Sequence, residues 1–193
     1  MKVELNTPLS IQEIDFRIQS INRGGYATIL AYKDARVDMK RLTDVYGVEY
    51  WQKKYQVVNG NLFCSVGLWN NVIKEWIWKE DVGTESMAEK EKGQASDAFK
   101  RACFNLGIGV ELYDYPVISI KLNQNTEAGK EKYGEWFLDS GKPKQGFGLK
   151  LKQWVWFSQF TEGKLTYLAS KDQDGKVRYS FGKYVKEEKL KTA

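Results

Sequence analysis

Two turn signals divide the middle of the chain into short segments that favour β-structure. Asn59-Gly60 and Asn70-Asn71 separate three runs rich in aromatic and β-branched residues. Asn-Gly is a strong hairpin signal because both residues tolerate the positive φ angles of a tight turn. We therefore predict a three-stranded antiparallel meander with strands at residues 50–58, 61–69 and 72–79.

The longest helical pattern follows this meander, at residues 85–106. Gly107-Ile108-Gly109 ends the pattern, and one face of the helix is lined by Ala95, Phe99, Ala102 and Leu106. The order of elements predicts an α+β fold, in which a curved antiparallel β-sheet with a β-β-β-α core packs on one long helix.

Shorter elements are predicted on the N-terminal side of the meander. Ser10-Ile11-Gln12-Glu13 matches a capping box and indicates a short helix near residue 11. Residues 16–21 alternate apolar and polar side chains, as a half-buried strand does, and Tyr26 to Tyr32 is the expected returning strand.

Charge divides the chain into two regions at Pro116. Residues 1–116 carry 15 basic and 16 acidic side chains, a net charge of −1, whereas residues 117–193 carry 15 basic and 9 acidic ones, a net charge of +6. We predict a core domain over residues 1–116 and a basic, aromatic-rich extension over residues 117–193 that is mainly β-structure.

Within this extension, strands and loops alternate. Residues 149–160 and 165–181 are predicted to contain strands, with Asp174-Gly175 as a hairpin turn. Residues 123–147 are rich in Gly, Lys and Glu and are predicted to be a mobile loop, and residues 186–193 are expected to fray.

Composition excludes several classes of function. The 193 residues are 42% hydrophobic, which is enough for a packed core, and include no histidine and two cysteines. Zinc fingers and Ser-His-Asp or Cys-His catalysis are thereby excluded, and no Gly-Lys pair has the glycine spacing of a P-loop. We expect no cofactor, no metal, no membrane span and a cytoplasmic location, with Cys64 and Cys103 as buried, reduced thiols. Two classes of function are not excluded by the composition: a binding protein, and an enzyme whose catalytic groups are carboxylates.

A helix over residues 35–46, with Asp34 as its N-cap and Gly47 closing it, carries an unusual set of cations. Three of them share one face at i, i+3 and i+7 with no acid at matching spacing: Lys33, Arg36 and Lys40. Such a stripe suits phosphate binding, and a solvated face whose charges are paired elsewhere in the fold is the alternative. Arg41 is expected to be neutralised within the helix by Asp38 and Asp44.

A second pair of cations, Lys100 and Arg101, lies on the predicted long helix. Asp97 stands four residues before Arg101 and is expected to pair with it, whereas Lys100 has no acid at that spacing. Taken alone, a Lys-Arg pair on a helix is weak support for function.

The acidic candidates are Glu80, Asp81 and Glu85, since two close carboxylates can hold magnesium in a nuclease. Interleaved lysines favour an exposed, salt-bridged helix face instead. Tryptophan rings can stack on bases, but Trp51 and Trp69 lie in strand patterns that are typical of core positions.

Two blocks of the sequence are distinctive. The first comprises Lys79-Glu80-Asp81-Val82-Gly83, the segment from Lys92 to Ala102, Gly107, and Leu112-Tyr113-Asp114. The second runs from Tyr32 to Gly47, with Trp51 beyond it. In content and order these blocks resemble the annealing domain of the Rad fifty-two/Rad twenty-two family of single-strand DNA annealing proteins, over about residues 16–116.

This resemblance implies a site and an activity. In the family, an arginine on the first helix and a Lys-Arg pair on the long helix hold the DNA backbone, which points to Arg36, Lys100 and Arg101, with Lys33 and Lys40 beside them. It implies ATP-independent binding of single-stranded DNA and annealing of complementary strands in homologous recombination and DNA repair, by a homo-oligomeric ring without enzymatic catalysis. The family's second arginine, one turn beyond the Lys-Arg pair, is Phe104 here.

Because the chain is compact, it resembles in particular the family members of the bacteriophage or prophage type. The expected location is then the cytoplasm of a bacterial host, with the host's single-strand-binding protein as a further partner. Two alternatives remain: a single-strand-binding protein without annealing activity, and a metal-dependent nuclease that uses Glu80, Asp81 and Glu85.

Overall fold

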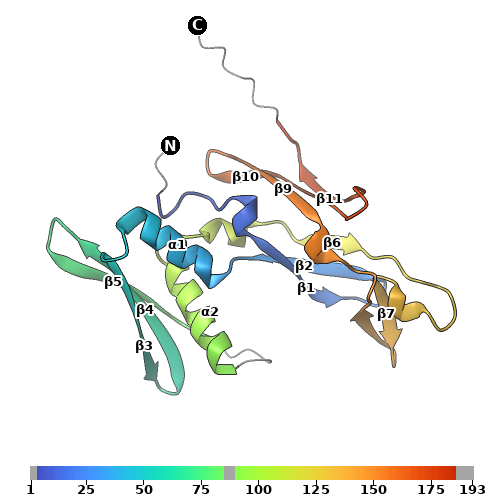
Figure 1. The fold of residues 1–193 in the computed structure, drawn as a ribbon, viewed down its shortest axis with the longest axis horizontal. Helices are drawn as coiled ribbons and strands as arrows, with labels where there is room; N and C mark the ends of the chain where they lie inside the picture. Colours follow the sequence, from blue (N-terminus) through green and yellow to red (C-terminus); the bar gives the residue numbers. More distant parts are fainter. Residues whose placement is uncertain (1–3, 85–89, 186–193) are drawn as a thin grey trace, which may run out of the picture. The chain divides into compact units, whose positions relative to one another are not determined.

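The computed structural model describes residues 4–84 and 90–185, and the chain forms two compact units (Figure 1). Unit 1 consists of Met1–Asp15 and Tyr32–Tyr113, and unit 2 consists of Phe16–Ala31 and Asp114–Ala193. The hairpin of residues 16–31 therefore packs with the C-terminal segments, although the expected core domain included it. Strand pairing explains this, because β2 (Tyr26–Tyr32) is hydrogen-bonded to β6 (Ile118–Lys121).

Unit 1 contains the predicted antiparallel meander, formed by β3 (Trp51–Val58), β4 (Asn61–Asn70) and β5 (Glu75–Val82). Asn59 and Gly60 join the first two strands with φ angles of 50° and 77°, the positive values that the turn requires. The third strand begins at residue 75 rather than at residue 72. The side-chain oxygen of Asn70 accepts hydrogen bonds from the backbone N–H groups of Val72 (2.9 Å) and Ile73 (3.3 Å) and so holds a longer turn.

Two helices complete unit 1, together with the predicted capping-box helix η1 (Ile11–Glu13) and η2 (Val110–Asp114). α1 (Ala35–Tyr46) has the predicted bounds, with Asp34 accepting a hydrogen bond from the Arg36 N–H (2.9 Å) and Gly47 ending the helix at φ 87°. α2 (Lys90–Phe104) ends two residues earlier than predicted. The start predicted at residue 85 lies outside the described residues.

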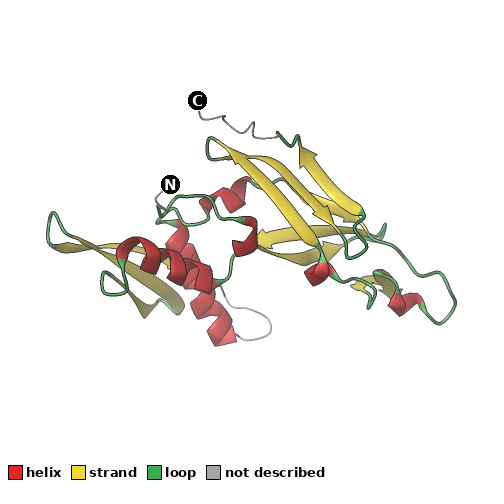
Figure 2. Ribbon diagram, turned by 45° about the horizontal axis from the view of Figure 1, so that its top comes forward, coloured by secondary structure: helices red, strands yellow, loops and turns green. Residues whose placement is uncertain are grey.

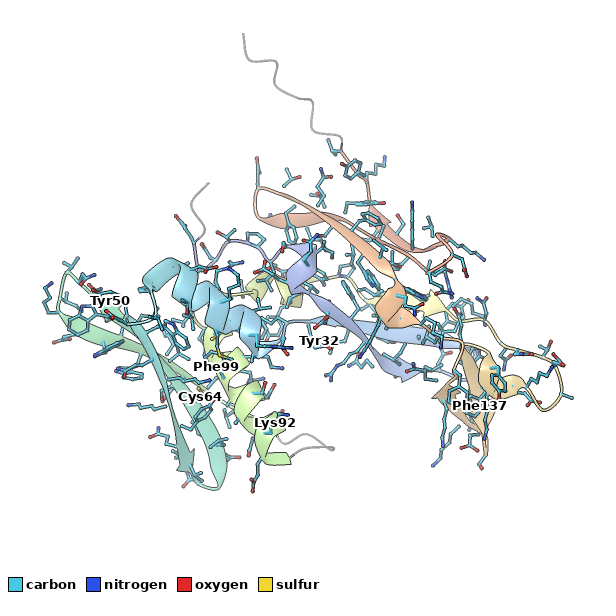
Figure 3. The ribbon with its side chains drawn as sticks, in the orientation of Figure 1. Tyr32, Tyr50, Cys64, Lys92, Phe99 and Phe137 are labelled. Carbon is cyan, nitrogen blue, oxygen red and sulfur yellow. The ribbon has the colours of Figure 1, made fainter. Side chains whose placement is uncertain are left out.

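The core of unit 1 lies between α2 and the meander. Phe99 of α2 is 1% exposed and Cys64 of β4 is fully buried (Figure 3), and the Phe99 ring stacks 6.4 Å from that of Trp51. Gly83 lets the helix approach the end of β5 closely, because a Cβ at this position would lie 2.2 Å from the Gln94 carbonyl oxygen.

Unit 2 is built from small sheets (Figure 2). One has the order β1-β2-β6, where β1 is Asp15–Ile21, and another has the order β11-β10-β9. The latter is formed by β9 (Val155–Thr161), β10 (Lys164–Lys171) and β11 (Val177–Gly182). Gly175 has φ 80° in the predicted turn between β10 and β11, so this turn prediction is confirmed.

The prediction of a mobile loop over residues 123–147 is wrong. This segment contains η3 (Glu131–Tyr133) and a hairpin of β7 (Trp136–Asp139) and β8 (Lys142–Gln145). The hairpin turn is Ser140-Gly141, with φ angles of 49° and 75°. A two-residue turn ending in glycine was the signal that could have revealed the hairpin.

The α+β class is confirmed, and the strands pair in antiparallel fashion. The predicted β-β-β-α core is formed in unit 1 by β3, β4, β5 and α2. Instead of one curved sheet on one long helix, however, the described residues form four small sheets and two α-helices of 12 and 15 residues.

A buried ion cluster ties the parts of unit 2 together. The guanidinium of Arg178 on β11 donates two hydrogen bonds to the carboxylate of Glu135, at 2.7 and 2.8 Å, and one to Asp172 at 3.2 Å. It also lies 4.6 Å from the ring centre of Trp154. Because the Arg178 side chain is only 5% exposed, these partners replace nearly all of its water contacts.

Replacing Arg178 with alanine should strongly destabilise the protein. The change leaves two buried carboxylates without a cation, which costs about 3 to 5 kcal/mol in comparable sites. The free energy of unfolding in urea, followed by tryptophan fluorescence, measures the effect. Arg178→Lys should recover only part of the loss, since lysine cannot donate the paired hydrogen bonds. A loss below about 1 kcal/mol in the alanine variant would contradict the importance of the cluster.

Candidate nucleic-acid interface

Arg36 lies on the exposed side of α1, one turn before Lys40. Its side chain is 85% exposed, and its Nε donates a 2.8 Å hydrogen bond to the Asp34 carboxylate that also caps the helix. The hydrogen bonds from Arg36 lower the pKa of Asp34. The cap therefore fixes the position of Arg36 while leaving most of its guanidinium in contact with solvent.

Lys100 is the candidate cation on the second helix, α2. α2 buries Phe99 and Cys103 against unit 1, so Lys100 lies beside this buried face, where α2 packs against α1. The charge of Lys100 acts on Asp34, whose pKa it helps to lower after the larger effect of Arg36. Arg36 is hydrogen-bonded to this carboxylate, whereas Lys100 acts on it only through its charge. Within residues 4–84 and 90–185, Lys100 has no ion pair of its own.

Arg101 faces a different neighbour. Successive helical residues diverge by about 100°, and this turns Arg101 toward β5. There its Nε donates to the Asp81 carboxylate at 3.2 Å, and its side chain is 41% exposed. The expected pairing with Asp97 is wrong, because that carboxylate accepts hydrogen bonds from the N–H and hydroxyl of Thr84, both at 3.0 Å.

Lys33 is not part of an exposed stripe, and its assignment to the DNA-binding face is wrong. The side chain is 1% exposed; its ammonium pairs with Asp38, donates to the Ile108 carbonyl, and lies 4.0 Å from the ring centre of Phe104. The reason is local geometry. Lys33 lies between the end of β2 at Tyr32 and the N-cap of α1 at Asp34, so it is outside the helix. The helical spacing that relates Arg36 to Lys40 therefore does not apply to it.

Arg41 is also buried rather than neutralised within α1. Its guanidinium donates to the carbonyls of Glu4 (3.2 Å) and Thr7 (2.6 Å) and reaches the Glu13 carboxylate at 3.5 Å. The two acids expected to neutralise it pair with the lysines of the predicted stripe, Asp38 with Lys33 and Asp44 with Lys40. Arg41 therefore holds the N-terminal segment onto α1.

We define the basic ridge of unit 1 as four cations of α1 and α2, of which two are exposed and two half-buried: Arg36 and Lys40, and Lys100 and Arg101. Three of these four have a carboxylate partner at the surface, and Lys100 has none in the described part of the chain. The ridge keeps four of the five candidates predicted from the sequence.

The acidic candidates do not converge. Glu80 and Asp81 are consecutive on β5 and point to opposite faces of the sheet. Glu80 accepts a hydrogen bond from the Ser65 hydroxyl at 3.1 Å, and Asp81 binds Arg101 and Asn105. Glu85 lies outside the described residues, and the rest shows no group of three or more potential metal ligands.

Both cysteines are free and buried, as predicted. Cys64 lies on β4 and Cys103 on α2, and burial is the main reason that the pKa of each thiol is raised, to about 11 for Cys64. Thiols held in this protonated state are poor nucleophiles, so their contribution is to the packing of the core.

The outer face of the meander carries aromatic side chains that the sequence reasoning missed. Trp76 stands opposite Trp69 with ring centres 5.5 Å apart, and Trp78 continues the row at 6.2 Å. Lys54 lies 4.2 Å from the ring centre of Trp78, which is 37% exposed. The alternation Trp76–Trp78 was the available signal, since residues two apart share a sheet face. Trp69 therefore belongs to this half-exposed row rather than to the core.

Comparison with protein-family models gave no match to this chain, and a search of curated proteins found no similar sequence. Neither described α-helix is long and apolar enough to cross a membrane.

The buried Lys33–Asp38 pair predicts a pH effect on stability. Burial raises the pKa of Asp38 to about 6, and the attraction of Lys33 only partly offsets this. Because the folded protein then holds this proton more tightly than the unfolded chain, the contribution of Asp38 to stability falls as pH rises from about 4 to 6. The fall should be roughly 1 to 3 kcal/mol, at about 1.4 kcal/mol per pKa unit.

Urea unfolding at pH values between about 4 and 7 tests this prediction. The Asp38→Asn variant should lack the fall, because its amide does not titrate. Asp44→Asn is the matched control on the exposed side of α1, and its profile should run parallel to that of the unchanged protein. Parallel profiles for both variants would show that Asp38 titrates normally.

Proposed function

We propose that this protein binds single-stranded DNA on the basic ridge of unit 1 and anneals complementary strands without hydrolysing a nucleotide. The observation that carries the proposal is that α1 and α2 pack together and each carries a candidate cation, Arg36 with a side chain that is 85% exposed and Lys100 without an ion pair in the described residues. An exposed arginine and a half-buried lysine that has no carboxylate partner in the described residues can both pair with a phosphate backbone.

The ion pairs of the ridge can exchange partners. The Arg36–Asp34 pair is 85% and 43% exposed, and the Lys40–Asp44 pair is 72% and 46% exposed. Pairs this exposed are weak, because water solvates both ions when they separate. A phosphate group can therefore take over the cations at little cost, unlike at the buried Lys33–Asp38 pair.

The packing of unit 1 also supports the resemblance to annealing proteins. The block from Lys79 to Gly83 forms the end of β5, and the block from Lys92 to Ala102 forms most of α2. Gly83 touches α2 at Gln94 and Ala98. These two segments of the first block that carries the resemblance thus form one contact, and that contact fixes where Lys100 and Arg101 lie on unit 1.

The mechanism implied is physical. Cations that bind phosphates release counterions and hold the strand without reading its sequence. Bases left free can then test a second strand, and Watson–Crick pairing supplies the selectivity. Each stacked step yields about 1.4 kcal/mol, so pairing proceeds without a nucleotide cofactor.

The proposal extends to assembly and context. We infer a homo-oligomeric ring that acts in recombination and repair in a bacterial host, in bacteriophage or prophage fashion, with the host's single-strand-binding protein as a further partner. Within the described part, β3 and β5 are the edges of the meander, and Val57 and Val58 on β3 are 69% and 42% exposed. Unpaired edges of this kind are suited to association between copies.

The second candidate is a single-strand binder without annealing activity, which the same ridge would serve. Nuclease activity has less support, because Glu80 and Asp81 point to opposite faces of β5 and are engaged with other side chains. These three activities are distinguished by mixing complementary oligonucleotides with the protein, in the presence of either magnesium or a chelator. Faster duplex formation with intact strands supports annealing, slower pairing supports simple binding, and shortened strands support the nuclease.

The Arg36→Gln/Lys100→Gln variant should bind single-stranded DNA more weakly for all sequences alike. The log–log dependence of affinity on salt should lose about 0.7 for each phosphate contact removed. Fluorescence anisotropy with a labelled oligonucleotide at several salt concentrations measures both quantities. Lys74→Gln/Lys183→Gln removes the same charge from residues that do not belong to the ridge and is the control. Equal affinity and slope in the folded ridge variant would remove the ridge from the site.

The protein should form a large closed assembly at micromolar concentration. Head-to-tail contacts between identical copies are satisfied by closing into a ring. Light scattering coupled to gel filtration measures the mass of the assembly. A monomer both with and without DNA would overturn the ring.

A further inference from the structure

Unit 2 contains a cavity of about 330 Å³ that no part of the proposed function uses. It is lined by residues of β1, by the last residue of β8, and by residues 149–153 around η4 (Leu151–Gln153). All of these segments belong to unit 2. A volume of this size is within the range of small-ligand sites.

The apolar part of the lining is well fixed. Phe16 on β1 stacks on Trp156 with ring centres 3.7 Å apart and planes 6° from parallel. Ile18 lies two residues further along β1 and shares the face of Phe16. Leu149 is 5% exposed and Leu151 is half-buried. These side chains offer a hydrophobic surface to a flat ligand.

The charged part of the lining is entirely basic. Lys150, Lys152 and Arg17 contribute to it, and the lining holds no carboxylate. Lys150 and Lys152 are exposed and form no ion pair within residues 4–84 and 90–185. By contrast, Lys144 of the neighbouring hairpin pairs with Asp139. The cavity therefore favours an anion.

Two amides complete the lining. The side chains of Gln145 and Gln153 make no hydrogen bond within the part of the chain that the structure describes. Each amide can both donate and accept, which is the pattern that the edge of a nucleobase requires, and glutamine is a recognised partner of adenine.

We propose that this cavity binds one nucleotide. The base lies against Phe16 and Ile18, its edge meets the glutamine amides, and the phosphate meets Lys150 and Lys152. The nucleotide is either a free mononucleotide or one residue of a nucleic-acid strand, since the two present the same chemistry. The proposal of a nucleotide site does not depend on DNA binding by the ridge of unit 1, because all residues that line the cavity belong to unit 2.

Isothermal titration of the full chain with deoxyadenosine monophosphate tests the proposal. A dissociation constant below about 1 mM is expected. Deoxyadenosine, which lacks the phosphate, and inorganic phosphate, which lacks the base, should each bind at least about tenfold more weakly. No measurable binding of the nucleotide, or equal binding of phosphate alone, would overturn the proposal.

Variants locate the binding. Lys150→Gln/Lys152→Gln should weaken nucleotide binding at least about tenfold, since it removes two charge-assisted contacts. Lys142→Gln/Lys183→Gln makes the same charge change outside the cavity and should alter affinity less than about twofold, because distant exposed charges are screened. Equal losses in the two variants would show that net charge, and not the cavity, attracts the nucleotide.

A competition arm distinguishes the two sources. If a short oligodeoxyadenylate displaces the mononucleotide in the Arg36→Gln/Lys100→Gln background, the cavity accepts a residue of a strand. If it does not, the ligand is a free nucleotide. Because the ridge is disabled in this background, failure of the cavity is distinguishable from failure of annealing.

Discussion

The burial of α2 against the meander is the interaction on which the layout of unit 1 depends. Phe99, Ala98 and Ala102 are all at most 1% exposed, and they face the buried residues of β4. The two alanines and Gly83 are small enough to let helix and sheet approach closely. Once this face is fixed, the helical repeat directs Lys100 toward α1 and Arg101 toward β5, so the position of the cations follows from hydrophobic packing.

Burial also decides which cations remain available. Lys33 and Arg41 are enclosed, and they bind Asp38 and backbone carbonyls because a buried charge must be paired. Arg36 and Lys40 sit on the opposite side of α1, where their acids are hydrated and weakly held. The difference between the enclosed cations and those of the proposed DNA-binding ridge is therefore one of solvation rather than residue type.

Unit 2 combines segments that are distant in sequence. Its buried Arg178 joins Glu135 and Asp172, and its first sheet pairs β2 with β6 across a long stretch of chain. The same assembly brings β1 beside residues 149–153 and creates the nucleotide cavity that we propose. The basic C-terminal region, predicted as an extension of the core domain, is thus part of a compact unit that also includes Phe16–Ala31 and contains this cavity.

The sequence by itself determined the local features: the bounds of α1 with Asp34 and Gly47, the Asn59-Gly60 turn, and the hairpin turn at Gly175. Helical spacing also singled out Arg36 and Lys40 as neighbours on one face of α1, whereas Lys100 became a candidate only through the resemblance to annealing proteins. Only the tertiary structure decided that Lys33 is buried, that Arg101 pairs with Asp81, and that residues 16–31 join the C-terminal segments. Caps and turns depend on neighbours a few residues away, whereas burial and the choice of ion partner depend on residues that only the folded chain brings together.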